Sequence, residues 1–475
     1  MKVRYIKSAT VVIEHGGKKV LCDPWLADGA YYGSWYHWPP LKFSAADFQD
    51  IDYIYISHVH PDHCDAETLK GLPKDKPVLI CDFHEKFLLN TLKRAGFQNI
   101  IEVPNRGTYE LGPDFRIEIL AGDDANSGRF ALVYSAPSTP TFEKSTNIDS
   151  MAIFSGGGKV VANTNDVPIA LINGACPYLL QKYGEIDLLL VSYAGAGPYP
   201  QAHEMERGAM ADCAIRSAYS YLGGTVTYIQ QLRPRYYLPY AGQYTLGGKN
   251  HWMNSYKGTF ELDELLSDLV PMIEGKGYRS EMVLLDSGET FDLGTCQASA
   301  PFTPTNFIER RDYIKNVLSR KQYDYEKDDG DPQDVLDRVE AAVRTLRRKQ
   351  EEFRYFTDAS VYIDTGLPYF YKVPFDGDSP VERAEEVKPD KIFIRARLDH
   401  RLFNRILDRR ANWNNAEVGS HVTLTHCVPQ AFYEKTRRSM EPMLHFMLAY
   451  LQEPRTDFAR AKEPAAVGKG EQNVY

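Results

Sequence analysis

One short loop of this chain carries four side chains that commonly ligate metal ions. His58, His60, Asp62 and His63 follow residues 54–57, an apolar stretch with the pattern of a buried strand. Imidazole and carboxylate groups are ligands of zinc and of non-haem iron, and ligands on one turn enclose an ion at a small loop-closure entropy. Three of the chain's 12 histidines stand within these six residues. The spacing therefore predicts a metal site at the end of a strand.

Strands and helices that could position this loop alternate along the first 300 residues. Residues 10–21 predict a β-hairpin, because two apolar runs flank the turn pair Gly16-Gly17. Further strands are predicted over residues 51–57, 77–81, 115–120, 151–154, 159–162, 186–192 and 282–285. Helices are predicted over residues 66–71, over 84–95 with an end at Gly96, and over 203–221 with an end at Gly223-Gly224. The alternation predicts an α/β domain built in layers.

The composition changes after Pro304, where an acidic, turn-rich stretch begins. We predict a metal-binding catalytic domain over residues 1–305, a partly acidic linker over 306–335, a smaller α+β domain over 336–462 and a flexible tail over 463–475. In the smaller domain, helices are expected over residues 334–356, 400–409 and 438–451, and a strand over 391–397.

Overall composition excludes several classes of protein. The 475 residues are 43% hydrophobic and 25% charged, which is typical of globular domains. A net charge of −9 provides no basic face for nucleic acid. No run of 18 apolar residues or leader pattern is present, so we expect a cytoplasmic protein with no membrane partner. The seven cysteines are scattered, which excludes a disulfide framework and an internal iron–sulfur cluster.

The order His-Val-His-Pro-Asp-His in residues 58–63 resembles the signature loop of the metallo-β-lactamase fold. Residues 23–26, the strand that ends at Asp166 and residues 233–239 also fall where that fold has recurring elements. The resemblance implies a four-layer αββα sandwich. Within the superfamily, the chain is most similar to CMP-N-acetylneuraminate hydroxylase without its Rieske domain. That likeness depends on residues 23–26, 33–38, 54–63, 192–197 and 239–244.

This resemblance implies a set of metal ligands. At two positions the chain lacks a histidine that hydrolases of the superfamily have. By position, His58 and His60 would bind one metal ion, Asp62 and His63 a second, and Asp166 would reach between them. Hydrolases of the superfamily supply another histidine where this chain has residues 122–125, and a last histidine where it has residues 240–242. Asp124 is a candidate replacement for the first of these. His203 or His251 could alternatively complete the site, although a lone histidine of this kind is more often a helix-start or surface residue.

Two histidines and one carboxylate are the set expected of non-haem Fe(II). His58, His60 and Asp166 supply that set, and Asp124 would make it richer in oxygen. We therefore expect one or two iron ions, with zinc or manganese as the alternative. The candidate catalytic residues are Asp62 and His203.

Other residues are candidates for supporting the metal or binding a substrate. Asp23 is expected to hydrogen-bond a ligating histidine. The aromatic segment 25–38 either stacks on a substrate or packs as a hydrophobic lid, and the basic residues either bind an anion or form a solvated turn. The candidates in these groups are Trp25, Trp35, Tyr193, Arg233, Arg235, Tyr240, Gln243 and Lys249.

Our leading hypothesis is an iron-dependent oxygenase that uses O2 on a small polar substrate such as a sugar, a nucleotide-sugar or an amino-acid-like molecule. Because the chain lacks the cysteine and histidine pairs of a Rieske centre, electrons would come from an external reductase or ferredoxin, or from the substrate. The alternatives are a metal-dependent hydrolase of a phosphoester, lactone or amide, and a metal-binding partner subunit without turnover. Residues 413–421 would cover the site or form a contact in a homodimer.

Overall fold

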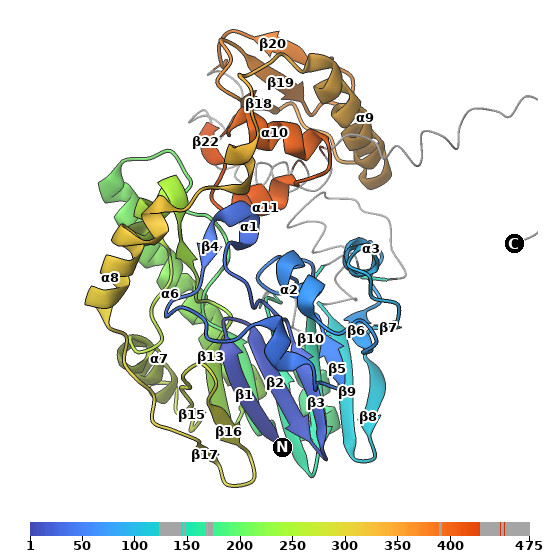
Figure 1. The fold of residues 1–475 in the computed structure, drawn as a ribbon, viewed down its shortest axis with the longest axis vertical. Coiled ribbons are helices and arrows are strands. Elements are labelled where there is room, and N and C mark those ends of the chain that lie inside the picture. The colour runs from blue at the N-terminus through green and yellow to red at the C-terminus, as the bar shows by residue number, and fades with distance from the viewer. Residues whose placement is uncertain are drawn as a thin grey trace, which may run out of the picture. The chain divides into compact units, whose positions relative to one another are not determined.

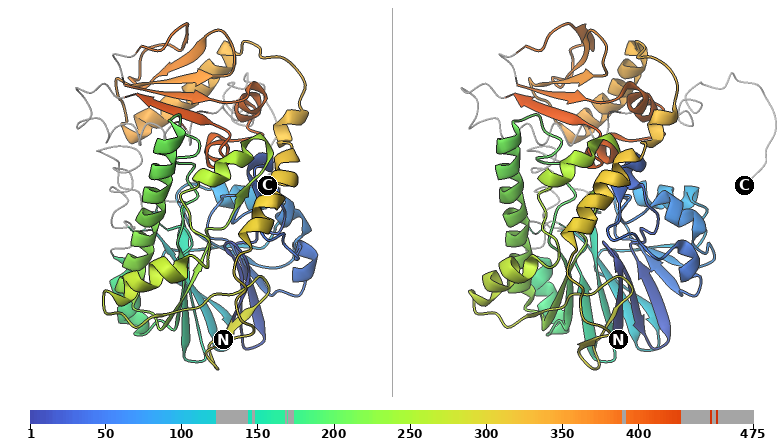
Figure 2. Two further views of the ribbon diagram at one scale, coloured as in Figure 1. Left: turned by 90° about the vertical axis from the view of Figure 1, so that its left-hand side faces the viewer. Right: turned by 60° about the vertical axis from the view of Figure 1, so that its left-hand side comes forward.

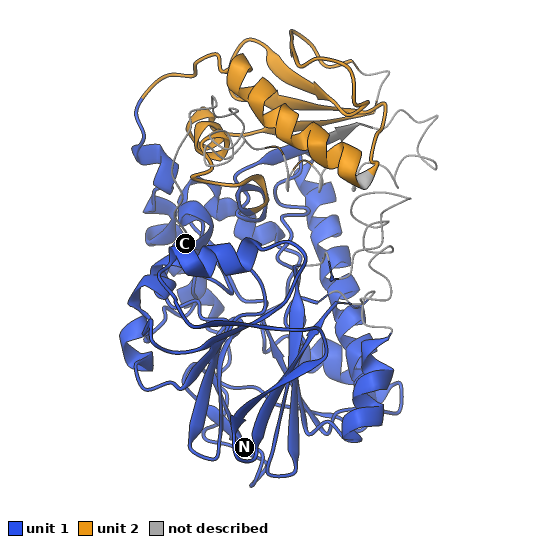
Figure 3. Cartoon of the chain, turned by 90° about the vertical axis from the view of Figure 1, so that its right-hand side faces the viewer, with its two compact units in different colours: residues 1–329, 415–425 blue, residues 330–414, 426–475 orange. Residues whose placement is uncertain are grey.

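The computed structural model describes residues 1–122, 144–145, 148–167, 169, 174–388, 392–427, 447 and 451. The chain forms two compact units, which Figure 3 distinguishes by colour. Unit 1 comprises Met1–Asp329 and Asn415–Thr425, and unit 2 comprises Gly330–Asn414 and His426–Tyr475. The division after Asp329 falls inside the segment predicted as a linker. Asn415–Thr425 belongs to unit 1, although the residues before and after it belong to unit 2. The predicted domains are continuous segments and therefore do not include this feature.

Unit 1 contains two large mixed sheets (Figure 1). The first has the order β17-β16-β1-β2-β3-β5-β6-β7 and the second the order β15-β13-β12-β11-β10-β9-β8. The strands of the first are β1 (Lys2–Lys7), β2 (Thr10–His15), β3 (Lys18–Cys22), β5 (Tyr53–Tyr55), β6 (Val78–Cys81), β7 (Ile100–Val103), β16 (Thr290–Asp292) and β17 (Gln297–Ala298). Those of the second are β8 (Gly107–Gly112), β9 (Phe115–Ala121), β10 (Ser150–Gly156), β11 (Lys159–Asn163), β12 (Leu188–Ser192), β13 (Tyr236–Tyr240) and β15 (Glu281–Met282). A small ribbon pairs β4 (Trp35–Tyr36) with β14 (Thr245–Leu246).

The two sheets share one apolar core and carry helices on their outer faces. Val11 and Val20 of the first sheet pack in one buried cluster with Phe154 of the second. Figure 2 shows helices on both outer sides of the paired sheets. The helices of unit 1 are α1 (Ala30–Gly33), α2 (Ala66–Gly71), α3 (Phe87–Arg94), α5 (Ala175–Tyr183), α6 (Arg207–Leu232), α7 (Leu265–Glu274) and α8 (Phe307–Asn316), with 3-10 turns η1 (Ala45–Phe48), η3 (Gly248–Tyr256), η4 (Leu318–Arg320) and η5 (Asp324–Lys327). The predicted αββα sandwich is confirmed.

The hairpin of β2 and β3 forms as its sequence indicates. Gly16 and Gly17 have φ of 57° and 74°, and a two-residue turn with positive φ at both positions favours glycine. The predicted helix over residues 66–71 coincides with α2. Gly96, just after α3, has φ of 89°, as expected for a glycine that ends a helix.

Helix α6 differs from its prediction at both ends. It begins at Arg207 and continues through Gly223-Gly224 to Leu232, so the predicted end at the glycine pair is wrong. Each internal glycine costs a helix about 1 kcal/mol relative to alanine. Val226, Ile229 and Leu232 lie beyond the pair at helical spacing and are buried, and burying such side chains stabilises the helix by about 1.5–3 kcal/mol each. The continuing apolar face therefore outweighs the local signal.

Unit 2 is a smaller α+β unit with a five-stranded sheet of order β20-β19-β18-β21-β22. Its elements are α9 (Leu336–Phe353), β18 (Ser360–Asp364), β19 (Phe370–Pro374), β20 (Glu382–Ala384), β21 (Phe393–Arg397) and α10 (His400–Leu407). The division between the units passes through α11 (Trp413–Val418) and β22 (Thr423–Cys427). The helix predicted over residues 438–451 lies outside the described residues, apart from positions 447 and 451. None of the described helices is both long and apolar enough to cross a membrane.

Candidate metal centre

The candidate metal ligands lie where the ends of several strands meet. The loop of residues 58–63 follows β5, and Asp166 follows β11. Asp149 comes directly before β10, which runs antiparallel to β11. The start of β10 therefore lies beside the end of β11, and this register brings Asp149 to the same end of the sandwich as Asp166.

His58 is the centre of one group of ligands. Its Nε2 atom lies 2.9 Å from Nδ1 of His60, 3.7 Å from Oδ1 of Asp149 and 3.9 Å from Oδ2 of Asp166. The His58 ring is completely buried. Burial lowers its pKa well below the ordinary value, and the neighbouring imidazoles lower it further. His58 is therefore neutral, which is the form that binds a metal ion.

His63 is the centre of a second group. Its Nε2 atom lies 3.3 Å from Oδ2 of Asp166 and 3.5 Å from Oδ2 of Asp62. This buried nitrogen has no hydrogen-bond partner within the described part of the chain. Burial alone would lower the pKa of His63, but the surrounding carboxylates, Asp166 foremost, raise it well above the ordinary value. His63 thus faces an excess of negative charge.

Asp23 and Ser57 fix the orientation of both buried rings. Asp23 follows β3 and accepts hydrogen bonds from the Ser57 amide at 2.7 Å and the Ser57 hydroxyl at 2.8 Å. Its Oδ2 atom also lies 3.0 Å from Nδ1 of His63, and Oγ of Ser57 lies 2.9 Å from Nδ1 of His58. Because the Nδ1 atoms are engaged, both Nε2 atoms point toward the carboxylates. The structure thus places Asp23 beside Nδ1 of His63, a candidate metal ligand, where the sequence analysis expected it.

Asp149 is a site residue that the sequence interpretation missed. It lies beside His58, in a position that the sequence interpretation assigned to Asp124, which is outside the described residues. Burial raises the pKa of Asp149 well above the ordinary value, and the nearby Asp166 raises it further. The available signal was an acidic residue two positions before the predicted strand over residues 151–154.

The donor set fits a metal ion. His58, His63 and Asp166 each place one ligand atom within 4.8 Å of the others. His60, Asp62 and Asp149 surround this triad, so three imidazoles and three carboxylates converge. The buried Nε2 atom of His63 has no hydrogen-bond partner, and adjacent carboxylates repel one another. A divalent cation would provide a partner for this nitrogen and would reduce the repulsion between the carboxylates. His58, His60 and Asp149 lie on one side of the cluster, Asp62 and His63 lie on the other, and Asp166 lies between them.

Comparison with known proteins identifies the domain. Residues 2–131 match the Beta-lactamase superfamily domain. The chain contains a metallo-β-lactamase superfamily domain. A Rieske 2Fe-2S iron-sulfur protein of Mycobacterium tuberculosis is 28% identical over 248 residues, which cover 51% of this chain and 44% of that protein. The cytidine monophosphate-N-acetylneuraminic acid hydroxylase of Cricetulus griseus is 32% identical over 127 residues, covering 25% and 22% of the two chains. The match thus spans less than half the length of either relative.

Two solved structures also resemble the chain. The diiron β-hydroxylase CmlA of Streptomyces venezuelae has 18% identity and a TM-score of 0.37, with 60% of this chain and 53% of that chain covered. An isothiocyanate hydrolase from Delia radicum gut bacteria has 16% identity and a TM-score of 0.41, with 62% and 99% covered.

A buried aromatic cluster adjoins the ligands of the superfamily domain. The hydroxyl of Tyr31 donates a hydrogen bond to Oδ1 of Asp62. The Tyr31 ring lies 4.5 Å from that of Trp35, which stacks on Tyr244 at 3.6 Å with an interplanar angle of 4°. Trp25 and Trp35 are 0% and 2% exposed. Since their faces are packed within the protein, the structure favours the packing alternative over a substrate-stacking surface.

Two further candidates make hydrogen bonds inside unit 1, and a third is buried there. The hydroxyl of Tyr240 donates to Oδ1 of Asn165 at 2.6 Å, directly before Asp166. Gln243 accepts from the Tyr5 hydroxyl at 3.4 Å. Tyr193 is 1% exposed.

The other candidates lie apart from the ligand cluster. Arg233 and Arg235 are exposed and precede β13, so they lie at the opposite end of that strand from Tyr240. Lys249 lies 3.2 Å from Oε1 of Glu326. Neither His203 nor His251 belongs to a ligand group found among the described residues.

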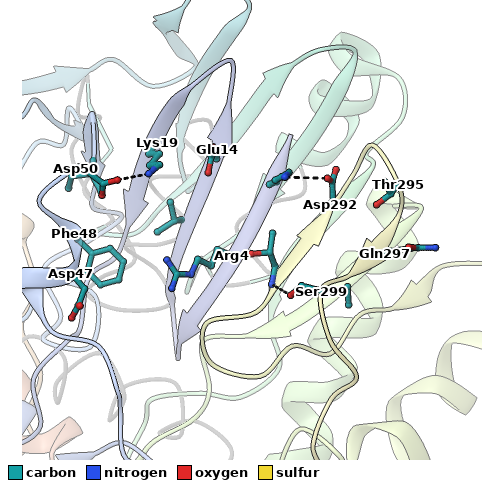
Figure 4. A pocket seen from close by; sticks show the side chains of 15 residues that line it. Arg4, Glu14, Lys19, Asp47, Phe48, Asp50, Asp292, Thr295, Gln297 and Ser299 are labelled. Atoms are coloured by element: carbon teal, nitrogen blue, oxygen red, sulfur yellow. Dashed lines mark hydrogen bonds and ion pairs between the residues drawn. The ribbon is translucent and has the colours of Figure 1, made fainter.

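A broad polar recess lies elsewhere on unit 1, over β1–β3, β16 and β17 (Figure 4). Two pairs of its charges are in contact, Lys19 with Asp50 at 2.5 Å and Lys2 with Asp292 at 3.7 Å. No metal-centre residue lines it.

Proposed function

We propose that the protein is a non-haem iron oxygenase that hydroxylates, or otherwise oxidises, a small polar substrate with O2. The observation that carries this proposal is the carboxylate of Asp149 beside His58. It makes the donor set three carboxylates and three imidazoles, and a harder, oxygen-rich set favours iron or manganese over zinc. The partial matches to a Rieske protein and to a hydroxylase support the same chemistry.

Different residues of the chain would bind the metal, orient its ligands and exclude water in this reaction. The ligand set would hold one or two iron ions, which when bound supply the redox chemistry of O2 activation. Asp23 and Ser57 keep the imidazoles of His58 and His63 in place. Tyr31 keeps its phenolic proton and donates it in a hydrogen bond to Asp62, since burial and that carboxylate raise the pKa of Tyr31 well above its ordinary value. The aromatic cluster excludes water from this side of the site.

The proposal includes an electron source. Hydroxylation by one O2 consumes two electrons and two protons and releases one water molecule besides the product. We propose that a reductase or ferredoxin supplies these electrons, or that the substrate does. The substrate class that we propose is a sugar, nucleotide-sugar or amino-acid-like molecule, and the chain could act as a homodimer.

The test is O2 consumption by iron-loaded protein with a ferredoxin, its reductase and NADPH, over a panel of amino sugars, nucleotide-sugars and amino acids. We expect consumption that depends on one compound class and product that carries oxygen from 18O2. Equal turnover with and without O2 would contradict the proposal. The variant Asp149→His provides a matched control, because it should shift the bound metal from iron toward zinc when both are supplied equally.

A metal-dependent hydrolase is the second candidate. Its supporting observation is the complete ligand loop with Asp166 reaching both histidine groups, because paired metal ions can activate water for attack on an ester. Zinc- or manganese-loaded protein that cleaves generic phosphoesters or lactones, with activity abolished by EDTA, would favour it. A metal-bearing partner subunit would instead co-purify with a reductase and be inactive alone.

A further inference from the structure

Three candidate metal ligands each have a buried polar residue next to them in the chain. These neighbours are Ser57, Ser150 and Asn165, which are at most 1% exposed. Ser57 lies in the loop after β5 of the first sheet, whereas Ser150 begins β10 and Asn165 follows β11, both in the second sheet. The ligands beside them are, in the same order, His58, Asp149 and Asp166.

Hydrogen bonds connect these three polar residues through the hydroxyl of Tyr55. The Ser150 hydroxyl donates to the carbonyl of Ser57 at 2.9 Å and lies 3.0 Å from the Tyr55 hydroxyl. Nδ2 of Asn165 donates to the Tyr55 hydroxyl at 3.3 Å and to the Ser150 carbonyl at 3.1 Å. Because the Ser150 proton is engaged by Ser57, Tyr55 is the donor to Ser150. Each of the two hydroxyls therefore donates one hydrogen bond and accepts one.

Tyr240, the last residue of β13, lies at the other end of this network. Its hydroxyl donates to Oδ1 of Asn165 at 2.6 Å and is also in contact with Oδ1 of Asn163. The side-chain amide of Asn165 thus has a partner for its oxygen and for both of its N–H groups. Tyr240 and Tyr55 are 1% and 0% exposed, and hydrogen bonds in such an interior are electrostatically stronger than in water.

The backbone of Asn165 determines the direction of Asp166. Asn165 has φ of 47°, a left-handed conformation that asparagine tolerates better than most other residues with a side chain. Its amide N–H donates to Oδ1 of Asn163 at 3.2 Å. Because Asp166 is the next residue and lies 3.9 Å from His58 and 3.3 Å from His63, a rotation at Asn165 would change both distances.

We propose that Tyr240 and Asn165 are positioning residues, and that the network from Tyr240 to Ser57 sets the spacing of the metal ligands. It holds the start of β10, the end of β11 and the loop after β5 together, and with them Asp149, Asp166 and His58. The network residues act through these ligands. The inference depends on the metal centre of the proposed function, and it applies equally to an oxygenase and to a hydrolase.

The test uses Co(II) alone as the probe metal with full-length protein, because the visible absorption of bound Co(II) depends on the arrangement of its ligands. Tyr240→Phe and Tyr55→Phe each remove one hydroxyl from the network. We expect both variants to shift the Co(II) bands and to weaken Co(II) binding about two- to tenfold in chelator competition. Tyr183→Phe is the matched control, because it removes a hydroxyl that donates to Glu118, outside the network. It should leave both the bands and the affinity unchanged.

Asn165→Gly separates the side chain of Asn165 from its backbone. Glycine adopts a positive φ without strain but has no amide group to join Tyr240 and Tyr55. We therefore expect Asn165→Gly to shift the Co(II) bands as Tyr240→Phe does. Wild-type bands in Asn165→Gly would show that only the backbone conformation is needed, and would overturn the inference.

Wild-type Co(II) bands and affinity in folded Tyr240→Phe and Tyr55→Phe would also overturn it, because the network would then contribute to stability alone. Thermal unfolding identifies the folded variants, and either tyrosine variant is sufficient for this comparison. Shifted bands in the variants of a protein without substrate-dependent O2 consumption would retain the positioning role and contradict the oxygenase proposal. Substrate-dependent O2 consumption by wild type, with wild-type bands in the variants, would do the reverse.

Discussion

Two buried carboxylate sites of unit 1 have opposite kinds of surroundings. Glu118, on β9, is completely buried and accepts hydrogen bonds from the hydroxyls of Tyr178 and Tyr183, and its Oε1 atom lies 2.9 Å from Nζ of Lys182. Both of its oxygens therefore have protein donors. At the metal centre, Asp149 and Asp166 face imidazole nitrogens and one another.

The difference separates a structural acid from a ligating one. A buried carboxylate with a lysine and two hydroxyls needs nothing further, whereas carboxylates gathered around histidines need a cation. Glu118 is fully buried and the side chains of Asp149 and Asp166 are 14% and 21% exposed, so all three carboxylates are largely removed from water and their partners distinguish the roles. The following predictions test this distinction.

The largest effect is expected from Asp166→Ala. This change removes the carboxylate that lies between both ligand groups, so we expect the purified protein to lose the metal that the site binds. Metal content by mass spectrometry is the measurement, and Glu118→Gln, which should retain the metal, is the control. Full metal content in Asp166→Ala would show that the cluster is not the binding site.

Glu118→Ala should act on stability alone. Removing this acceptor costs about 1–3 kcal/mol of unfolding free energy, because two tyrosine hydroxyls and the partly exposed Lys182 lose their hydrogen-bond acceptor. Urea denaturation measures the loss, and metal content per folded molecule should be unchanged. Loss of metal from folded Glu118→Ala would contradict a purely structural role.

Asp23→Asn should weaken metal binding less than loss of a ligand does. The variant keeps the size of the side chain but changes the group that holds Nδ1 of His63. Loss of such an outer partner typically lowers metal affinity about 10- to 100-fold. Competition with a chelator measures this, and an affinity equal to that of wild type would show that Asp23 only supports the loop.

Tyr31→Phe should have a smaller effect. It removes one hydrogen bond to Asp62 and leaves the stacked ring of Trp35 in place. We expect a loss of about 1 kcal/mol in unfolding free energy and a decrease in metal affinity smaller than that of Asp23→Asn. Chelator competition ranks the two variants, and the reverse order would contradict this assignment.

A separate effect, seen only as a pH dependence of stability, is expected at Glu417. Its pKa is about 8 in the folded protein and about 4.3 in an unfolded chain. Between these values the folded state holds a proton that the unfolded state has released, so this group's contribution to stability falls as the pH rises toward 8. The Tm of Glu417→Gln relative to wild type should therefore rise from about pH 5 to about pH 8. A constant difference would indicate that Glu417 is ionised throughout.

The sequence by itself determined the features that depend on near neighbours. The ligand loop of His58 to His63 follows one strand and is complete within six residues. The β2–β3 turn needs only the positive φ of Gly16 and Gly17, and α2 coincides with its pattern. Alternation of strands and helices, with the loop motif, was sufficient for the αββα fold.

The tertiary structure decided everything that depends on strand register or on distant segments. Asp149 reaches His58 because β10 runs antiparallel to β11, and no local spacing expresses that pairing. Helix α6 passes Gly223-Gly224 because its later residues find an apolar surface to cover. His421 reaches the Tyr31 loop because residues 415–425 return to unit 1. Local patterns specify turns and loops, whereas the partners of a buried charge are set only when the sheets and returning segments pack.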